Sequence, residues 1–134
     1  MAQQDKNNHT LNVSLGIVGS RYFDNYSQFS LMVSSWIDKL PPSTQIARIV
    51  SGDAKGADAL AERFAREHKI MFHKHVADWN KYGKAAGPLR NQLIVGQCTH
   101  LIAFVGTKSI GTKSTIKFAK TKGIPITQFS CSCE

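Results

Sequence analysis

Five apolar, β-rich runs alternate with four amphipathic stretches along this chain, and most of the runs end at or beside a glycine. In the first amphipathic stretch, Phe29, Val33 and Trp36 recur at helical spacing. Parallel strands need a crossover between them, so this alternation predicts an α/β fold. We expect a three-layer α/β/α sandwich with a mainly parallel sheet of about five strands. The expected strands are 11–20, 46–52, 69–76, 99–106 and 124–129, and the expected helices are 26–40, 56–68, 87–97 and 112–123.

The chain has the size of one domain, with 134 residues of which 42% are hydrophobic and 19% charged. We expect a flexible N-terminal segment over 1–11, a single domain over 12–129 and a tail over 130–134. The polar start MAQQDKNNHT lacks the apolar centre of a signal peptide, and no apolar run approaches the roughly 18 residues of a membrane span. These features predict a cytoplasmic protein without a membrane partner.

Three cysteines, Cys98, Cys131 and Cys133, are too few and too irregularly spaced to indicate a disulfide framework. The C-x-C tail lacks the four spaced ligands of a typical zinc site, so we expect no metal and no cofactor. The formal net charge of +8 favours an anionic partner such as a nucleotide, a phosphate or a nucleic acid, although it also serves solubility.

Three strand ends lead into turns that contain glycine with serine or threonine: VGSRYF, VSGDAKGAD and FVGTKSIGTKST. In a doubly wound sheet these turns lie at one edge, where ligands bind, and helix N-termini there favour anions. Neither the G-x-G-x-x-G fingerprint nor the P-loop spacing G-x-x-x-x-G-K-[ST] is present. An ordinary dehydrogenase, kinase or ATPase is therefore not indicated.

Several side chains beside these turns have both a binding and a structural interpretation. Arg21 can form a fork on phosphate or lie on the surface. Asp58 can accept a ribose hydroxyl or simply complement a helix dipole, whereas Asp53 is interpreted as a turn residue. Arg90 can clamp a phosphate or have a purely structural role.

The polar stretch DWNKYGKAAGPLRNQ, residues 78–92, carries aromatic side chains between two apolar runs. Trp79 and Tyr82 can stack on a base or cover the edge of the core, and their place in a polar loop favours the base. The two rings of this stretch are therefore candidates for stacking on a base.

Four segments together resemble the SLOG superfamily, in its YspA-like, cpYpsA-related branch: GSRYFDNY, IVSGDAKGADALAERFA, DWNKYGKAAGPLRNQLIV and LIAFVGTKSIGTKSTIKFA. The resemblance extends from about Val13 to Thr127. It implies a Rossmann-like fold with a pocket for nucleotides or nucleotide-derived ligands. Its wider relatives include LOG phosphoribohydrolases, the DNA-processing protein DprA and sensors of NAD-derived signals.

The resemblance also implies a set of ligand-binding residues, drawn from every turn at the expected edge. They are Gly19, Ser20, Arg21, Ser51, Gly52, Gly56, Ala57, Asp58, Asp78, Trp79, Gly87, Pro88, Arg90, Asn91, Gly106, Ser109, Gly111 and Thr112.

The chain departs from the LOG hydrolases at their PGGxGTxxE motif, whose glutamate serves N-glycoside cleavage. The matching stretch VGTKSIGTKST places Ser114 and Thr115 where carboxylates would be. An oxocarbenium-like transition state needs a nearby carboxylate. Catalytic residues thus stay undetermined, with Asp58, Asp78 and Arg90 as the candidates.

Three functions follow from these observations. The first is binding of a nucleotide-type small molecule, such as an NAD- or ADP-ribose-type signal or a nucleoside monophosphate, as a sensor or sequestering protein. The second is an N-glycoside hydrolase that uses Asp53, Asp58 or Asp78. The third, ranked last, is single-stranded nucleic-acid binding, supported by the net charge and the aromatic residues. A homo-oligomer is expected in each case.

Overall fold

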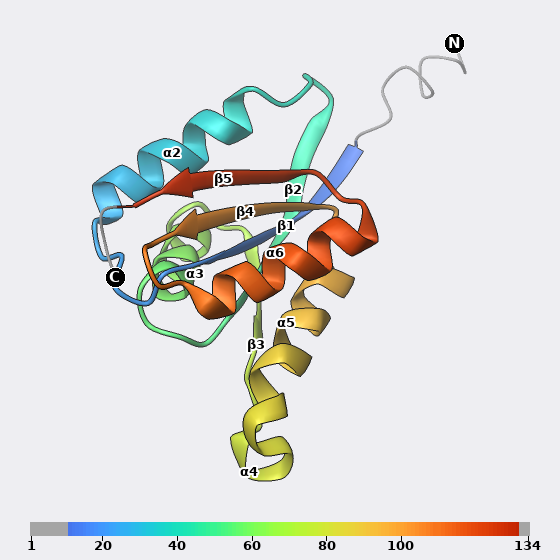
Figure 1. The fold of residues 1–134 in the computed structure, drawn as a ribbon. Helices are drawn as coiled ribbons and strands as arrows, with labels where there is room; N and C mark the ends of the chain where they lie inside the picture. The colour runs from blue at the N-terminus through green and yellow to red at the C-terminus, as the bar shows by residue number, and fades with distance from the viewer. Residues whose placement is uncertain (1–10, 132–134) are drawn as a thin grey trace.

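The computed structural model describes residues 11–131, which form one five-stranded sheet flanked by helices (Figure 1). The strand order is β3-β2-β1-β4-β5 and every neighbouring pair is parallel, which confirms the predicted α/β class. The elements in chain order are β1 (Leu11–Gly19), α2 (Tyr26–Asp38), β2 (Thr44–Gly52), α3 (Ala57–Glu67), β3 (Met71–His75), α4 (Trp79–Tyr82), the 3-10 helix η1 (Gly83–Ala85), α5 (Ala86–Gly96), β4 (His100–Val105), α6 (Ile110–Lys122) and β5 (Ile126–Ser130).

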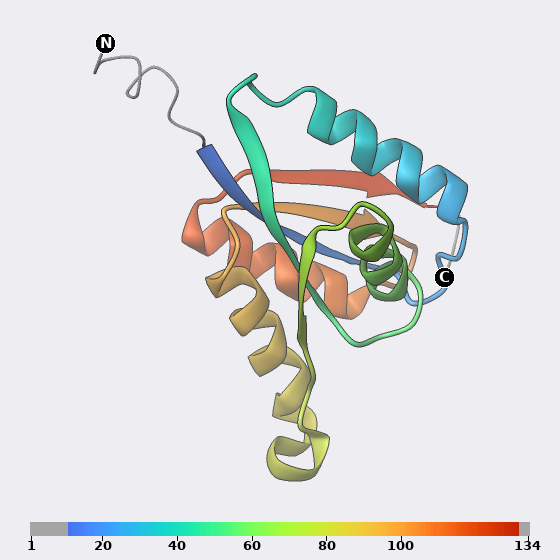
Figure 2. The same ribbon diagram turned by 180° about the vertical axis from the view of Figure 1, so that it is seen from behind.

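Two helical layers cover the sheet, α2 and α3 on one face and α5 and α6 on the other (Figures 1 and 2). Successive side chains of a strand point to opposite faces, so β1 contributes Ile17 to the first layer and Val18 to the second. The first core is aromatic: Phe29 of α2 stacks on Phe104 of β4, with ring centroids 4.9 Å apart. The second core is aliphatic, and it packs Ile94 of α5 against the sheet.

The strand order reverses between β1 and β4. From β1 the chain adds β2 and β3 on one side, and it then crosses to the other side for β4 and β5. The connections that leave the carboxyl ends of β1 and β4 therefore run to opposite faces of the sheet. A crevice at this point is where open α/β sheets bind ligands.

Residues 76–86 form an arm that extends from the body of the domain beyond β3 (Figures 1 and 2). The sequence predicted a loop here, but α4 and η1 occupy most of it, and α5 begins at Ala86 rather than at Gly87. The cause lies partly in Asp78, whose carboxylate accepts the backbone N–H of Lys81 at 3.1 Å and caps α4.

Within residues 11–131, no helix is both long and apolar enough to cross a bilayer. The same residues contain no cluster of three or more His, Cys, Asp or Glu side chains able to hold a metal. Cys133 of the C-x-C tail lies outside the described residues.

Candidate nucleotide-binding site

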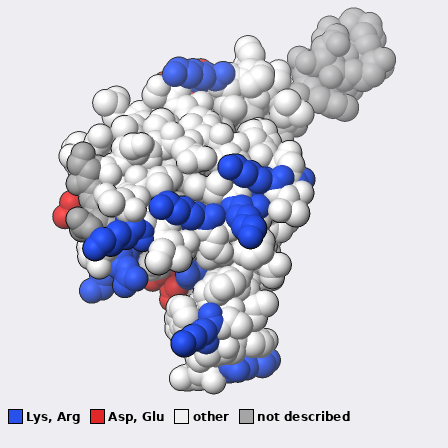
Figure 3. Space-filling view, viewed as in Figure 1, with Lys and Arg blue, Asp and Glu red and all other residues white. Residues whose placement is uncertain are grey.

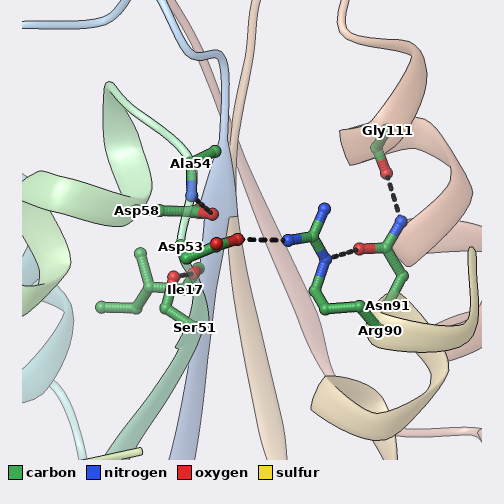
Figure 4. A network of polar contacts seen from close by, with 8 residues as sticks. All are labelled: Ile17, Ser51, Asp53, Ala54, Asp58, Arg90, Asn91 and Gly111. Atoms are coloured by element: carbon green, nitrogen blue, oxygen red, sulfur yellow. Dashed lines mark hydrogen bonds and ion pairs between the residues drawn. The ribbon is translucent and has the colours of Figure 1, made fainter. Parts of the chain in front are cut away.

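Gly52 ends β2 at the carboxyl edge of the sheet, and two charged side chains approach its backbone closely. A Cβ atom at this position would lie 2.6 Å from Asp58 Oδ2 and 2.9 Å from Arg90 Nη1. Such distances are too short for real contacts, so only glycine allows both groups to approach the backbone. Gly52 therefore leaves room at one strand end for a carboxyl from α3 and a guanidinium from α5. Figure 4 shows these two side chains, Asp58 and Arg90.

Asp58 lies in the first turn of α3 and is buried, with 7% of its surface exposed. Its Oδ2 accepts the backbone N–H of Ala54 at 3.2 Å, which closes the turn between β2 and α3. Burial raises the pKa of Asp58 to about 6 from its ordinary value of 3.8, although the Ala54 N–H and the positive charge of Arg90 act in the opposite direction. The side chain is thus a carboxyl whose pKa lies about two pH units above that of an ordinary aspartate.

Arg90 joins the β2–α3 turn to α5. Its Nη1 donates to Asp53 Oδ1 at 3.1 Å, and its Nε donates to Asn91 Oδ1 at 2.9 Å. The amide of Asn91 in turn donates to the carbonyl oxygen of Gly111, in the first turn of α6, at 3.4 Å. This chain of contacts orients the guanidinium at the carboxyl edge of the sheet (Figure 4).

The sequence interpretation favoured a turn role for Asp53 and otherwise named it only among the spare aspartates of the hydrolase hypothesis, so its contact with Arg90 was not predicted. The structure pairs it with Arg90, with 35% of the Asp53 side chain and 15% of the Arg90 side chain exposed. Nothing in local sequence couples two residues 37 positions apart. The signal that could have indicated this contact is the position of Asp53 directly after a strand that ends in glycine, since this places it at the same sheet edge as the start of α5.

The β1–α2 turn packs tightly on the start of α3. The backbone N–H of Ala57 donates to the carbonyl oxygen of Ser20 at 3.0 Å, and Gly56 adopts a φ of 73°. A Cβ at Gly56 would overlap the backbone of Ser20 and Arg21, and one at Gly19 would lie 2.7 Å from Phe104. These glycines thus have a packing role here, and a ligand contact from them stays a prediction.

Hydroxyl groups at the edge are mostly engaged within the protein. Ser51 Oγ donates to the carbonyl oxygen of Ile17 at 2.6 Å and links β2 to β1. Ser109 Oγ accepts the backbone N–H of Gly106 at 2.8 Å, which shapes the β4–α6 turn. Thr112 is buried beside that turn, whereas Gly111 is exposed.

Trp79 packs against α5 from the arm. A Cβ at Gly87 would lie 3.2 Å from the indole, so the ring lies over a position without a side chain. Gly87 precedes Arg90 by three residues and Asn91 by four, which places all three on one face of α5. The indole therefore lies about one helical turn, roughly 5 Å along the axis of α5, from the position of Arg90. Trp79 is 56% exposed.

Other predicted residues lie apart from this network. Arg21 is exposed, with its guanidinium 5.8 Å from the centre of the Tyr22 ring. Asp78 caps α4 in the arm, and Pro88 is exposed in the first turn of α5. The structure thus brings Gly52, Asp58, Arg90, Asn91 and Gly111 together, and it adds Asp53.

Two known proteins are similar to this chain in sequence or in fold. The chain is 34% identical over 98 residues to the Gene 61 protein of Mycobacterium phage D29, an alignment that covers 69% of this chain and 78% of the phage protein. The X-ray structure of DNA processing protein A (DprA) from Streptococcus pneumoniae superposes with a TM-score of 0.65 at 23% identity. That superposition covers 87% of this chain and 50% of DprA, so the chain spans about half the length of DprA.

The family model matches residues 17–82, the region from β1 through the β2–α3 turn to the arm. It therefore includes Gly52, Asp53 and Asp58, while Arg90 follows on α5. The resemblance inferred from the sequence is confirmed. The chain belongs to the YspA, cpYpsA-related SLOG family.

Proposed function

We propose that the chain binds a nucleotide or nucleotide-derived ligand at the carboxyl edge of its sheet, as a sensor or sequestering protein. The observation that carries this proposal is the fixed position of Arg90, oriented by Asp53 and Asn91 next to the bare backbone of Gly52. A guanidinium has the planar donor geometry that matches a phosphate. The carboxyl edge beside the reversal of strand order is the usual ligand position of this architecture.

Each part of a nucleotide has a candidate partner at this edge. The ligand phosphate replaces Asp53 on Arg90, because two anions compete for one guanidinium. Asp58 provides a carboxyl that can accept a ribose hydroxyl. Trp79 offers an exposed aromatic face to the base, on the face of α5 that also carries Arg90.

The family supports a nucleotide rather than another anion, because the SLOG resemblance implies nucleotide-type ligands. The name of DprA, a DNA processing protein, points to nucleic acid as an alternative for a relative of this fold. A site built around one oriented arginine favours a small ligand, because an extended strand would need several cations.

The test is calorimetric titration of the purified protein with AMP, NAD, ADP-ribose and cyclic ADP-ribose isomers. We expect at least one of these to bind, and Arg90→Gln to weaken binding about 10- to 100-fold, the usual worth of a charged hydrogen bond. Arg66→Gln is the matched control, since Arg66 is an exposed arginine at the far end of α3. Equal losses in both variants, or no binding of any of these nucleotides, would refute the proposal.

Native mass spectrometry of the same samples reports the subunit number. We expect a homo-oligomer, and a monomeric mass with or without nucleotide would overturn that expectation.

A second candidate function, N-glycoside hydrolysis, is favoured by the environment and position of Asp58. The pKa of Asp58 is raised to about 6 by burial, which suits a carboxyl that donates or accepts a proton near neutral pH. Asp58 also lies beside Arg90, where the ligand phosphate is proposed to bind. Incubation of nucleotides with the protein, followed by liquid chromatography, should then release free base or nicotinamide, and Asp58→Asn should abolish the release. If the nucleotide is still intact after long incubation, hydrolysis is refuted and only the binding proposal remains.

A further inference from the structure

The positive charge of this protein is concentrated in one part of the chain. Residues 79–133 contain eight of the 17 Lys and Arg residues and no Asp or Glu, so they account for the whole formal charge of +8. This segment includes α5 and α6, which together cover one face of the sheet. The excess charge is therefore carried mainly by one layer of the sandwich.

Three lysines of α6 form a row along a surface groove between this helix and β5. Lys113, Lys117 and Lys120 line a hollow of about 300 Å³. The other residues that line it are Val105, Ile116 and Gln128. Figure 3 shows basic side chains gathered over this face, with few acidic ones among them. None of the ion pairs formed within residues 11–131 involves the three lysines.

A fourth lysine of α6 has a different, structural role. Lys122 Nζ donates to the carbonyl oxygens of Val95 and Cys98 at 2.9 Å each, and to that of Gly96 at 3.3 Å. It thus satisfies carbonyl groups at the end of α5, where helices leave acceptors unpaired. No comparable contact within the described chain explains the row formed by Lys113, Lys117 and Lys120.

Helix stability does not explain the row either. Lys113 is the fourth residue of α6, near the positive end of the helix dipole, where a cation is unfavourable. Lys113 and Lys117 are four residues apart, and like charges at this spacing cost about 0.2–0.5 kcal/mol. Only Lys120, in the last turn, is favoured by the dipole. An anionic partner would offset these costs.

We propose that this lysine groove binds the sugar-phosphate backbone of a nucleic acid, at a site distinct from the nucleotide site around Arg90. The three lysines are spaced about 6 Å and about 4.5 Å along the helix axis, which suits contact with consecutive phosphates of one strand. Lysine acts as a point charge without base or sequence preference. The recessed apolar residues, Val105 and the buried Ile116, do not offer the protruding surface that membrane insertion requires.

The test is fluorescence anisotropy with a fluorescein-labelled 20-nucleotide oligo(dT), titrated with the full chain between 50 and 300 mM NaCl. Three phosphate contacts with a single strand contribute about −2 to the slope of log K against log salt concentration. The triple variant Lys113→Gln, Lys117→Gln, Lys120→Gln should reduce the slope by about that amount and weaken binding roughly tenfold or more at 50 mM NaCl.

A matched control removes the same charge from the other face of the sandwich. Lys39, Arg66 and Lys69 are exposed residues around α2 and α3, and their triple change to Gln should leave the slope within about one unit of the wild type. Equal losses in both triple variants, or unchanged binding in the α6 variant, would overturn the proposal. So would binding of poly-glutamate or of phosphatidylserine vesicles under the same conditions without binding of the oligonucleotide.

The two proposed sites can fail independently. Arg90→Gln should weaken nucleotide binding about 10- to 100-fold. It should change the oligonucleotide slope by no more than about one, since it removes one cation. The α6 triple variant should bind nucleotide with unchanged affinity, which also verifies that it is folded. If Arg90→Gln removes the salt-dependent binding instead, oligonucleotide binds at the sheet edge and the lysine groove has no such function.

Discussion

Replacement of Asp58 by asparagine should stabilise the protein at neutral pH, although it alters the candidate site. Burial raises the pKa of this carboxyl from 3.8 to about 6, so between about pH 4 and pH 6 the folded state holds a proton that the unfolded state has lost. At about 1.4 kcal/mol per pH unit, the rise corresponds to about 3 kcal/mol of unfavourable ionisation in the folded protein above pH 6. Asparagine keeps the shape and can still accept the backbone N–H of Ala54, without a charge.

The sign of the pH dependence follows from the raised pKa. Protonation of Asp58 stabilises the folded state fully below about pH 4, and this contribution is lost as the pH rises through about 6. The difference in unfolding free energy between Asp58→Asn and the wild type should therefore be near zero at pH 4. It should increase to a plateau of up to about 3 kcal/mol above pH 7.

Urea denaturation of both proteins at pH 4.5, 5.5, 6.5 and 7.5 measures this difference. Asp38→Asn is the control, because it removes one carboxylate from an exposed position at the end of α2. It should show no comparable gain. A difference that does not change with pH, or an Asp58→Asn variant less stable than the wild type at pH 7.5, would refute the reasoning. A confirmed gain would indicate that the wild type keeps a costly carboxyl for its function.

Three further predictions concern glycines and a cysteine. Gly56→Ala should lower the free energy of unfolding by about 3–5 kcal/mol in denaturant titration, because its Cβ would overlap the backbone of Ser20 and Arg21 at a positive φ. Gly123→Ala, which has a positive φ but open space, should lower it by only about 1–2 kcal/mol. Equal losses of stability in the two variants would contradict this prediction. Gly52→Ala should displace Asp58 and Arg90 and lower nucleotide affinity at least tenfold by calorimetry, whereas Gly96→Ala, in open space on α5, should leave it unchanged. Burial raises the pKa of Cys98 to about 12, so its thiol should be unreactive in the folded protein at pH 8. Peptide mapping after iodoacetamide treatment should find Cys98 unmodified in folded protein and modified in 8 M urea. Rapid labelling of Cys98 in the folded protein would contradict this prediction.

Much of the fold was predictable, because its signals are local. The β-rich runs and the three-to-four-residue spacing of apolar side chains indicated every strand and four helices, and these lie close to the expected ranges. The segment 78–86 was an exception. Its composition is that of a loop, and the capping contact of Asp78 with Lys81 that starts α4 is a detail of backbone geometry rather than of hydrophobic pattern.

The candidate site was predictable as a location more than as a set of contacts. Glycine-terminated strands of a parallel sheet place their following turns at one edge, and that edge carries Gly52, Asp58 and Arg90. The pairing of Arg90 with Asp53 was not predictable. Neither was the hydrogen bond that the Ala57 N–H donates to the carbonyl oxygen of Ser20, which keeps this N–H from a ligand. Such contacts depend on which loops become neighbours in space.

By itself, the sequence determined the alternation of strands and helices, the parallel sheet and the edge at which a ligand would meet glycine turns. These follow from periodicities of two and 3.6 residues and from the backbone freedom of glycine, which act over a few neighbouring positions. Only the tertiary structure decided that Arg90 meets Asp53, that Trp79 covers Gly87, and that three lysines of α6 line a groove against β5. These contacts depend on strand order and helix packing, because each of them joins residues from different elements of the fold.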